Sequence, residues 1–329
     1  MNSLDPDCNV SPGEAAEGRH RGALRRGSLL IPQGRQGTGA PFRHLRAPYP
    51  VSMDHLDRLE SQSVYILREA FNRIDRLAML WSLGKDSNVM VWLARKAFFG
   101  RVPFPVMHID TGKKFPEMYA FRDQYTAVWE LNLLREECPP VDAVDPTLPP
   151  AARSAARKTL GLRDAIAKHK FTGIIAGIRR DEEGTRAKER YFSPRNLEGE
   201  WNVKDQPPEF WNQFMTDFPP GTHVRIHPLL HWTELDIWQY IKRENMPIVP
   251  LYFAKPYGEF YGQDYKNQMM RFRSLGEKGI TFPLPSSAMT IDEIIEELKT
   301  TKTSERAGRP MGADEDASSF ERLRAAGYM

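Results

Sequence analysis

A short polar stretch, Ser82-Leu83-Gly84-Lys85-Asp86-Ser87, separates an apolar run from an apolar helical pattern. Where a strand feeds a helix, unpaired backbone amides converge on one point, and the positive end of the helix dipole lies there too. Gly84 lets the backbone come close to a ligand. Ser82 and Ser87 add hydroxyl groups, and Lys85 adds a full charge. The stretch predicts a phosphate-binding turn, although an ordinary helix cap would use the same residue types.

Two familiar phosphate-binding signatures are missing from the chain. Neither the Walker sequence G-x-x-x-x-G-K-[ST] nor the dinucleotide fingerprint G-x-G-x-x-G occurs. The form S-x-G-x-D-S instead resembles the PP-loop, the pyrophosphate-binding turn of the ATP pyrophosphatase superfamily. That resemblance implies ATP as a substrate, bound through residues 82–87.

Polar residues also end the next apolar run, 104–110, where the sequence reads His108-Ile109-Asp110-Thr111-Gly112. In a doubly wound sheet, ligands bind at the carboxyl ends of the strands, so this segment should lie beside the glycine turn. Asp110 can also simply cap the next helix. By analogy with the superfamily, we expect the adenine near His108, Asp110, Thr111 and Gly112.

A run of mixed charges follows a third apolar segment, 173–178. Its basic residues lie within twelve positions and are Arg179, Arg180, Arg186, Lys188 and Arg190. Such a run is usually a solvated face. At the end of a central strand, facing a phosphate turn, arginines instead suit the clamping of an anion. We therefore predict that these cations bind the anionic groups of the ligands, and that Gly177 touches the nucleotide.

Cysteines and histidines give no metal-binding pattern. Cys8 and Cys138 are the only cysteines, and neither forms a C-x-x-C pair. They cannot hold a four-ligand zinc or iron–sulfur site, and such sparse cysteine is typical of a reducing cytoplasm. His227 and His231 are interpreted as core or loop residues, with a ligand contact as the alternative for His231. We expect no metal site of the protein's own.

From Asp54 onward, apolar segments typical of buried strands alternate with segments that have the apolar period of a helix. Strands are predicted at 77–81, 104–110, 131–136 and 173–178, and helices at 54–74, 87–99, 115–129 and 153–169. This alternation predicts an α/β fold with a doubly wound, mostly parallel sheet and helices on both faces, resembling the adenine nucleotide alpha hydrolase-like fold. A further strand is expected in 222–232, with helices after Thr233 and Thr290.

Composition divides the chain into three parts. Residues 1–50 are rich in Gly and Arg without apolar periodicity, which predicts disorder; a true start at Met53 and a transit peptide are the alternatives. Residues 51–250 are predicted to form the nucleotide-binding domain. Residues 251–329 are predicted to form an irregular region that contacts a partner. Long ordered loops are expected at 190–222 and 250–287.

The charge balance and hydropathy exclude two classes of partner. The net charge is +3 over 329 residues, which is too even to indicate nucleic acid. No apolar run approaches the ~20 residues that a membrane helix needs. We expect a cytoplasmic protein.

Taken in order, these motifs resemble one family, the small catalytic subunit of the bacterial two-subunit sulfate adenylyltransferase. The resemblance runs from about Asp54 to the C-terminus, and the segments 138–154 and 277–288 depart from it. The matching stretches are SLGKDS at 82–87, HIDTG at 108–112, RRDEE at 179–183, RAKER at 186–190, PLLHWTELDIW at 228–238, IIEE at 294–297, TSERAGR at 303–309 and GYM at 327–329.

The resemblance implies a reaction in which ATP and sulfate give adenosine 5′-phosphosulfate and pyrophosphate. It implies Mg²⁺ with the nucleotide, and a large partner subunit that hydrolyses GTP, in agreement with the missing Walker sequence. Within this scheme Lys85, Arg179 and Arg180 are expected to be catalytic. The candidates for sulfate or phosphate contacts are Arg179, Arg180, Arg186, Lys188 and Arg190.

Three alternatives stay open. A phosphoadenylylsulfate or adenylylsulfate reductase shares the fold but needs a C-terminal nucleophilic cysteine, and none follows Cys138. An adenylyltransferase could act on an acid other than sulfate. A non-catalytic relative could serve only to bind the GTPase subunit.

Overall fold

The computed structural model describes residues 53–182, 184–196, 199–210, 213–301 and 305. The predicted disorder of 1–50 and the motif at 327–329 lie outside these residues, as does the motif at 303–309 apart from Glu305. The helices and strands, in chain order, are α1 (His55–Arg73), β1 (Leu77–Leu80), α2 (Lys85–Ala97), β2 (Val106–Asp110), α3 (Pro116–Val128), β3 (Leu133–Glu137), α4 (Pro150–His169), β4 (Gly173–Ile175), β5 (Phe192–Arg195), β6 (His223–Ile226), α5 (Glu234–Arg243), β7 (Lys255–Phe260), β8 (Gln263–Arg271), β9 (Leu284–Pro285) and α6 (Ile291–Thr300).

The main sheet has six strands in the order β3-β2-β1-β4-β6-β5. Neighbouring strands are parallel except for β5, which runs antiparallel to β6. From β1 the chain moves outward through β2 to β3, then returns through α4 to β4 on the other side of β1. The strand order therefore reverses between β1 and β4, which is where ligands bind in doubly wound folds.

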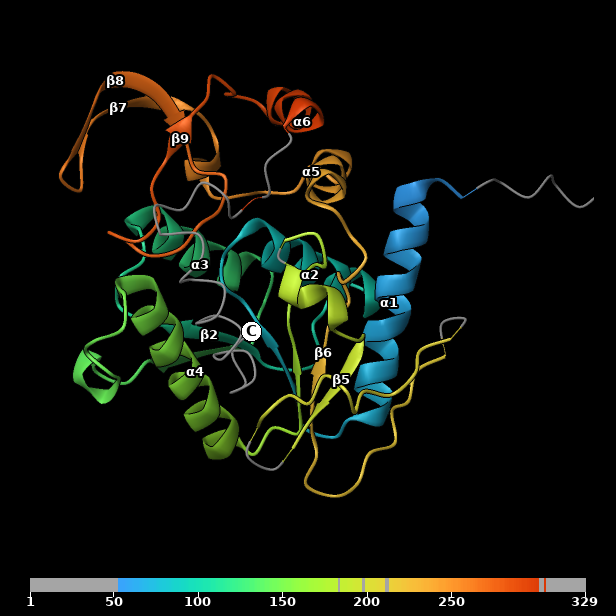
Figure 1. Cartoon of the computed structure of the whole chain (residues 1–329). Helices are drawn as coiled ribbons and strands as arrows, with labels where there is room; N and C mark the ends of the chain where they lie inside the picture. Colours follow the sequence, from blue (N-terminus) through green and yellow to red (C-terminus); the bar gives the residue numbers. More distant parts are fainter. Residues whose placement is uncertain (1–52, 183, 197–198, 211–212, 302–304, 306–329) are drawn as a thin grey trace, which may run out of the picture. The chain divides into compact units, whose positions relative to one another are not determined.

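Helices cover both faces of this sheet, with α4 on one side and α1 on the other (Figure 1). The buried side chains of β1 alternate accordingly. Ala78 and Leu80 pack with Leu162 and Ala165 of α4, whereas Leu77 and Met79 belong to the larger core formed with α1, α2 and α5. The predicted doubly wound, mostly parallel α/β fold is confirmed.

A second sheet lies in the region where we expected long loops. Strands β7, β8 and β9 form a three-stranded antiparallel sheet, so the expectation of loops was wrong for Lys255–Phe260 and Gln263–Arg271. Tyr261 and Gly262 connect β7 to β8 with φ angles of +49° and +78°. Two consecutive positive φ angles are typical of the tight type I′ hairpin turn. Within the described part of the chain, no helix has the length and apolar character to cross a bilayer.

Candidate active site

The turn after β1 takes its shape from Leu83. This residue adopts a left-handed conformation with φ = +70°, while Gly84 has an ordinary φ of −76° and caps helix α2. The left-handed conformation costs a non-glycine residue about 1–2 kcal/mol. Complete burial of the Leu83 side chain offsets this cost, since burying a leucine contributes about 1.5–3 kcal/mol.

Gly84 is therefore not needed for its conformational freedom. A Cβ atom added to it would lie 3.5 Å from Ser82 Oγ and 3.6 Å from Tyr252 Oη, both ordinary contact distances. The expected close approach of backbone occurs instead at Gly177, after β4. A Cβ atom there would lie 3.4 Å from the backbone nitrogen of Ser87. Gly177 thus allows the end of β4 to touch the first turn of α2.

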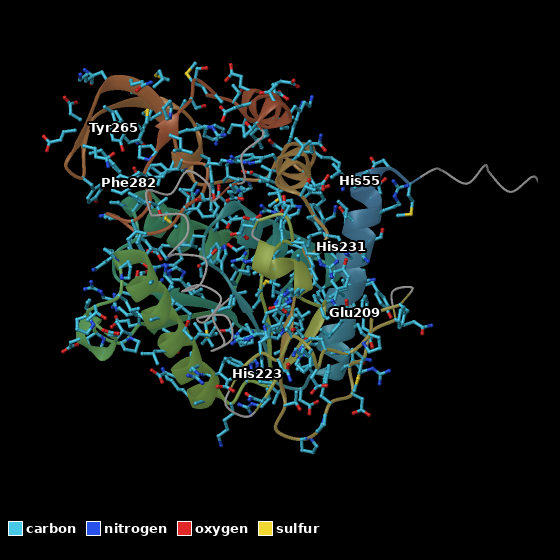
Figure 2. The ribbon with its side chains drawn as sticks, in the orientation of Figure 1. His55, Glu209, His223, His231, Tyr265 and Phe282 are labelled. Atoms are coloured by element: carbon cyan, nitrogen blue, oxygen red, sulfur yellow. The ribbon has the colours of Figure 1, made fainter. Side chains whose placement is uncertain are left out.

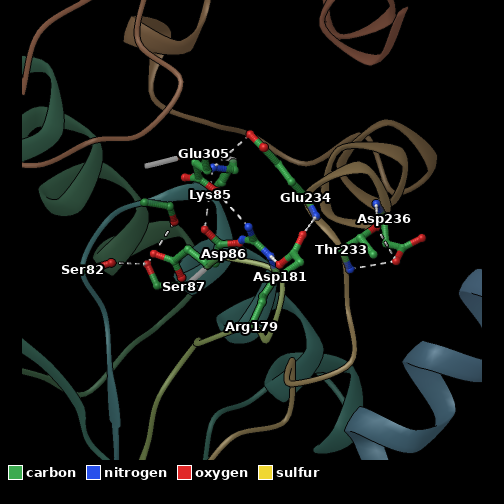
Figure 3. Close-up of polar contacts among 12 residues, drawn as sticks. Ser82, Lys85, Asp86, Ser87, Arg179, Asp181, Thr233, Glu234, Asp236 and Glu305 are labelled. Atoms are coloured by element: carbon green, nitrogen blue, oxygen red, sulfur yellow. Dashed lines mark hydrogen bonds and ion pairs between the residues drawn. The ribbon is translucent and has the colours of Figure 1, made fainter. Parts of the chain in front are cut away.

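The first turn of α2 presents unused donors. Lys85 donates its backbone N–H to Tyr252 Oη at 2.8 Å. No acceptor in the described part of the chain binds the backbone N–H groups of Leu83, Gly84, Asp86 or Ser87. The Ser82 and Ser87 hydroxyls contact each other at 3.1 Å (Figure 3). Amides at a helix N-terminus together with a left-handed residue make an anion-binding nest.

A cavity of about 240 Å³ opens beside this turn, at the carboxyl ends of β1, β2 and β4 and against α4. Its apolar wall comes from strand and α4 side chains, and its polar wall from the turn and from the residues after β4. The lining residues are Leu80, Trp81, Ser82, Asp86, Ser87, Met107, Ile109, Lys114, Lys158, Thr159, Leu162, Ala176, Gly177, Ile178, Glu182 and Arg186.

Strand β2 contributes different residues from the ones we expected. Met107 and Ile109 line the cavity. Alternate residues of a strand face opposite sides of a sheet, so His108 and Asp110 point to the other face. His108 is fully buried, with Nδ1 at 2.8 Å from the Trp81 carbonyl oxygen.

Asp110 and its neighbours shape the loop after β2. Asp110 accepts bonds from the Gly112 N–H at 2.9 Å and from Tyr119 Oη at 2.8 Å, and these two bonds help keep its pKa low against the opposing effect of burial. Thr111 is buried, and Gly112 has a φ of +72°. None of the three is among the residues that line the cavity.

A buried charge cluster lies next to the turn and shares Asp86 with the cavity wall (Figure 3). The Lys85 ammonium lies 2.5 Å from Glu305 and 3.5 Å from Glu234. Arg179 is fully buried, 2.8 Å from Glu305 and 2.9 Å from Asp181, and it also pairs with Asp86.

These ion pairs shift the pKa values of Lys85 and Glu305. Burial opposes the charge of Lys85, but the carboxylates of Glu305 and Glu234 outweigh burial and raise the pKa of Lys85. Burial also favours the neutral acid of Glu305, yet Lys85 and Arg179 outweigh it and lower the pKa of Glu305 to about 2. Lys85 and Glu305 are therefore both charged at neutral pH.

The predicted basic residues after β4 separate in space. Arg186 lines the cavity and pairs with Glu182. Arg180 contacts the His231 ring, which Figure 2 labels, and donates to the Glu189 carbonyl oxygen at 2.9 Å. Lys188 is exposed, and Arg190 donates to the Lys188 carbonyl oxygen at 3.3 Å. Arg179, Arg180, Lys188 and Arg190 do not line the cavity.

Two lysines of the cavity wall were missed by the sequence reasoning. Lys114 lies just beyond the predicted HIDTG motif, and Lys158 lies in a helix that we had treated only as a cover for the sheet. The helical spacing of Lys158, Thr159 and Leu162 was the available signal for a wall, because these positions share one side of α4. In the described part of the chain, no group of three or more His, Cys, Asp or Glu side chains could hold a metal ion.

The chain is similar in sequence to a known family and to several known proteins. Residues 76–283 match the family described as "Phosphoadenosine phosphosulfate reductase domain". "Sulfate adenylyltransferase subunit 2" of Trichlorobacter lovleyi is 42% identical over 84% of this chain and 99% of that protein. This chain belongs to the sulfate adenylyltransferase subunit 2 family. The protein of the same name from Pseudomonas paraeruginosa is 43% identical over 84% of this chain and 98% of its own length.

The family resemblance predicted from the motifs is thus confirmed, and with it membership of a nucleotidyltransferase family. Among solved structures, the chain is similar to Candida glabrata FMN adenylyltransferase in complex with ATP, with 19% identity and a TM-score of 0.47, covering 83% of this chain and 87% of that chain.

Proposed function

We propose that this chain transfers the adenylyl group of ATP to sulfate, giving adenosine 5′-phosphosulfate and pyrophosphate. The observation that carries the proposal is the cavity at the strand ends, where the amides of Asp86 and Ser87 have no acceptor among the described residues. The name of the relatives, sulfate adenylyltransferase subunit 2, supports sulfate as the acceptor.

In this proposal the pyrophosphate part of ATP binds at the turn, with Mg²⁺ accompanying the nucleotide as part of the substrate. The adenosine lies along the apolar wall formed by Met107, Ile109 and Leu162. A sulfate oxygen attacks the α-phosphorus, the bond to the bridging oxygen breaks, and the electron pair leaves with pyrophosphate. Sulfate is a weak nucleophile, so alignment supplies much of the rate, and the amides stabilise charge on the leaving group.

We propose that Lys85 supports the same leaving group from the charge cluster beside the cavity. Lys85 is not among the residues that line the cavity, and the carboxylates of Glu305 and Glu234 hold its ammonium ionised. Lys85→Ala should lower turnover by about 10²-fold or more if it stabilises the leaving pyrophosphate. Lys96→Ala, at the far end of helix α2, is the control and should keep its turnover.

Loss of folding must be separated from loss of catalysis in that test. Lys85→Arg keeps the positive charge beside Glu234 and Glu305 and should restore part of the turnover. If Lys85→Ala turns over like the wild type, Lys85 has no part in the reaction. If Lys85→Arg is as inactive as Lys85→Ala while both unfold like the wild type, the positive charge of Lys85 does not account for its effect on turnover.

We further propose that the chain works with a large subunit that hydrolyses GTP. The words "subunit 2" in the relatives' name support a multi-subunit enzyme. The product anhydride is high in energy, and the chain has no Walker sequence of its own, so coupling to a GTPase on another chain would supply the missing free energy.

The deciding experiment measures pyrophosphate release from ATP, with and without sulfate and with and without the GTPase subunit. We expect release that depends on sulfate and increases when the partner turns over GTP. Release that depends instead on another acid would identify a different adenylyltransferase. Retained binding to the GTPase subunit without any release would identify a non-catalytic partner.

A further inference from the structure

Two lysines line the cavity outside the turn at residues 82–87. Lys114 lies in the loop between β2 and α3, just beyond the HIDTG motif, and Lys158 lies on α4. Lys114 is only 5% exposed, and the Lys158 side chain is 30% exposed. They contribute two cations to a small cavity, and neither belongs to the motifs predicted to bind the nucleotide.

The other charged groups of the cavity wall already form ion pairs, within the wall or with the charge cluster beside it. Asp86 pairs with Arg179, and Glu182 pairs with Arg186. For the Lys114 ammonium, in contrast, the described part of the chain provides no carboxylate oxygen within 4.0 Å. Lys114 is therefore a buried cation of the wall that lacks a close counter-ion in the described residues.

The two ammonium groups also act on each other. Burial, followed by the charge of Lys158, lowers the pKa of Lys114 to about 8. Two like charges in a confined wall are destabilising unless an anion lies close to both. A tetrahedral dianion such as sulfate would remove that repulsion and would be held by charge-assisted hydrogen bonds.

The second lysine is held in place by a buried carboxylate. The Lys158 ammonium lies 2.6 Å from Glu277, which also accepts a bond from Ser154 and is only 2% exposed. The segment carrying Glu277 is tied to the loop of Lys114, because the Lys278 N–H donates to the Lys113 carbonyl at 2.8 Å. Glu277 therefore holds Lys158 through an ion pair, and its own segment is hydrogen-bonded to the loop that carries Lys114.

We propose that Lys114 and Lys158 bind the sulfate that accepts the adenylyl group, and that Glu277 positions Lys158 for this task. The proposal rests on the function proposed above and names the acceptor site within it. Sulfate carries no proton at neutral pH, so the lysines transfer none; they hold the oxyanion while one of its oxygens bonds to the α-phosphorus.

The first test separates sulfate from the nucleotide. Lys114→Met and Lys158→Met remove the charge but keep an apolar stem of similar length. We expect the KM for sulfate to rise roughly 10- to 100-fold in each variant, as for the loss of a hydrogen bond to a charged group. The KM for ATP should change less than about twofold. Lys168→Met, on an exposed part of α4, is the control and should change neither.

The possible outcomes are distinct. A wild-type protein that releases no pyrophosphate with sulfate would defeat the proposed function itself. An active wild type with an unchanged sulfate KM in both variants would overturn this inference alone. A rise in the KM for ATP instead of sulfate would also overturn it, because it would assign the lysines to the phosphates of ATP.

The second test uses pH. A lysine carries its charge below its pKa, so sulfate binding to the free enzyme should weaken as the pH rises through about 8, and the sulfate KM should increase. Lys114→Met should abolish that increase. A wild-type sulfate KM that is flat from about pH 7 to 9 would contradict the proposal. The ionisable groups that act on Lys114 from the surrounding elements are Lys158, Glu277, Asp110, Cys138 and His108.

Discussion

Glu305 shows how a single residue can control the charge of a whole site. Its carboxylate lies between Lys85 and Arg179 and is almost completely buried. A buried cation without a partner costs several kcal/mol. Although Asp86 lies near both cations, Glu305 makes the shortest ion pair of Lys85 among the described residues, at 2.5 Å. Glu305 is therefore a counter-ion to two buried cations.

Glu305→Gln should lower the free energy of unfolding by about 1.5–3 kcal/mol at neutral pH, since it removes a charge from two hydrogen bonds. The effect should depend on pH. The pKa of Glu305 is lowered to about 2 in the folded state, so its contribution is present above about pH 4.5 and is lost as the pH falls toward 2.

Urea unfolding of the wild type and the variant between about pH 7 and pH 3 measures this. The difference between the two should shrink as the solution becomes more acidic. Glu296→Gln, on an exposed part of α6, is the matched control and should match the wild type throughout. A pH-independent difference would show that the Glu305 carboxylate is not the source of the stability.

At the residue scale, the sequence indicated which residue types form the site, but it was a poorer guide to the direction in which the side chains of a strand point. The hydroxyls of the turn and Gly177 were predicted to contact the nucleotide, and the structure brings them together around one cavity. The direction of β2 was predicted wrongly, because its polar residues His108 and Asp110 were expected to face the ligand and lie instead on the face opposite the cavity. Met107 and Ile109 therefore replaced His108 and Asp110 at the cavity wall.

At the scale of elements, two helices begin with the same device. Thr233 of α5 and Thr290 of α6 each accept a bond from the third residue of the helix, whose carboxylate returns a bond to the cap. Both threonines are exposed. Only α5 leads directly into the charge cluster, because the Glu234 N–H donates to Asp181 at 2.8 Å and its carboxylate lies 2.7 Å from Arg273.

Thr233→Ala and Thr290→Ala should each destabilise the protein by about 1 kcal/mol, the usual cost of a lost N-cap. Thr233→Ala should also lower turnover, because a frayed α5 displaces Glu234 from Lys85. Thr290→Ala should leave turnover unchanged. Thermal unfolding and pyrophosphate release on the same samples test both statements; equal turnover losses in the two variants would disconnect α5 from the site.

The sequence predicted the elements of the main sheet better than those of the later chain. The apolar runs of β1, β2 and β4 and the amphipathic α1 and α4 have clear periods. Strands β7 and β8 are largely exposed, with polar residues on both faces of β8, so they lack the alternation by which a half-buried strand is recognised. Their pairing depends on the turn at Tyr261 and Gly262.

For the molecule as a whole, the strand order explains why the site lies where it does. The reversal between β1 and β4 puts α2, which follows β1, and α4, which precedes β4, on opposite faces and leaves a space at the strand ends. The resulting cavity draws its wall from residues spread between Leu80 and Arg186. Nucleotide bound there should therefore stabilise the entire fold and not just the turn.

ATP with Mg²⁺ at about 100 times its dissociation constant should add about 2.7 kcal/mol to the free energy of unfolding. For a protein of this size, that corresponds to a rise in Tm of roughly 4–5 °C. Gly177→Val should abolish the rise, because the γ-methyl groups of valine would extend beyond a Cβ atom that already lies 3.4 Å from the Ser87 backbone nitrogen and would push α2 away from β4. Thr290→Ala should lower the Tm, but ATP should still raise the Tm of this variant by the full amount, because the lost N-cap lies at the start of α6. A normal ATP-dependent rise in Gly177→Val would mean that the nucleotide binds away from the junction of β4 and α2, and the proposed site would have to be abandoned.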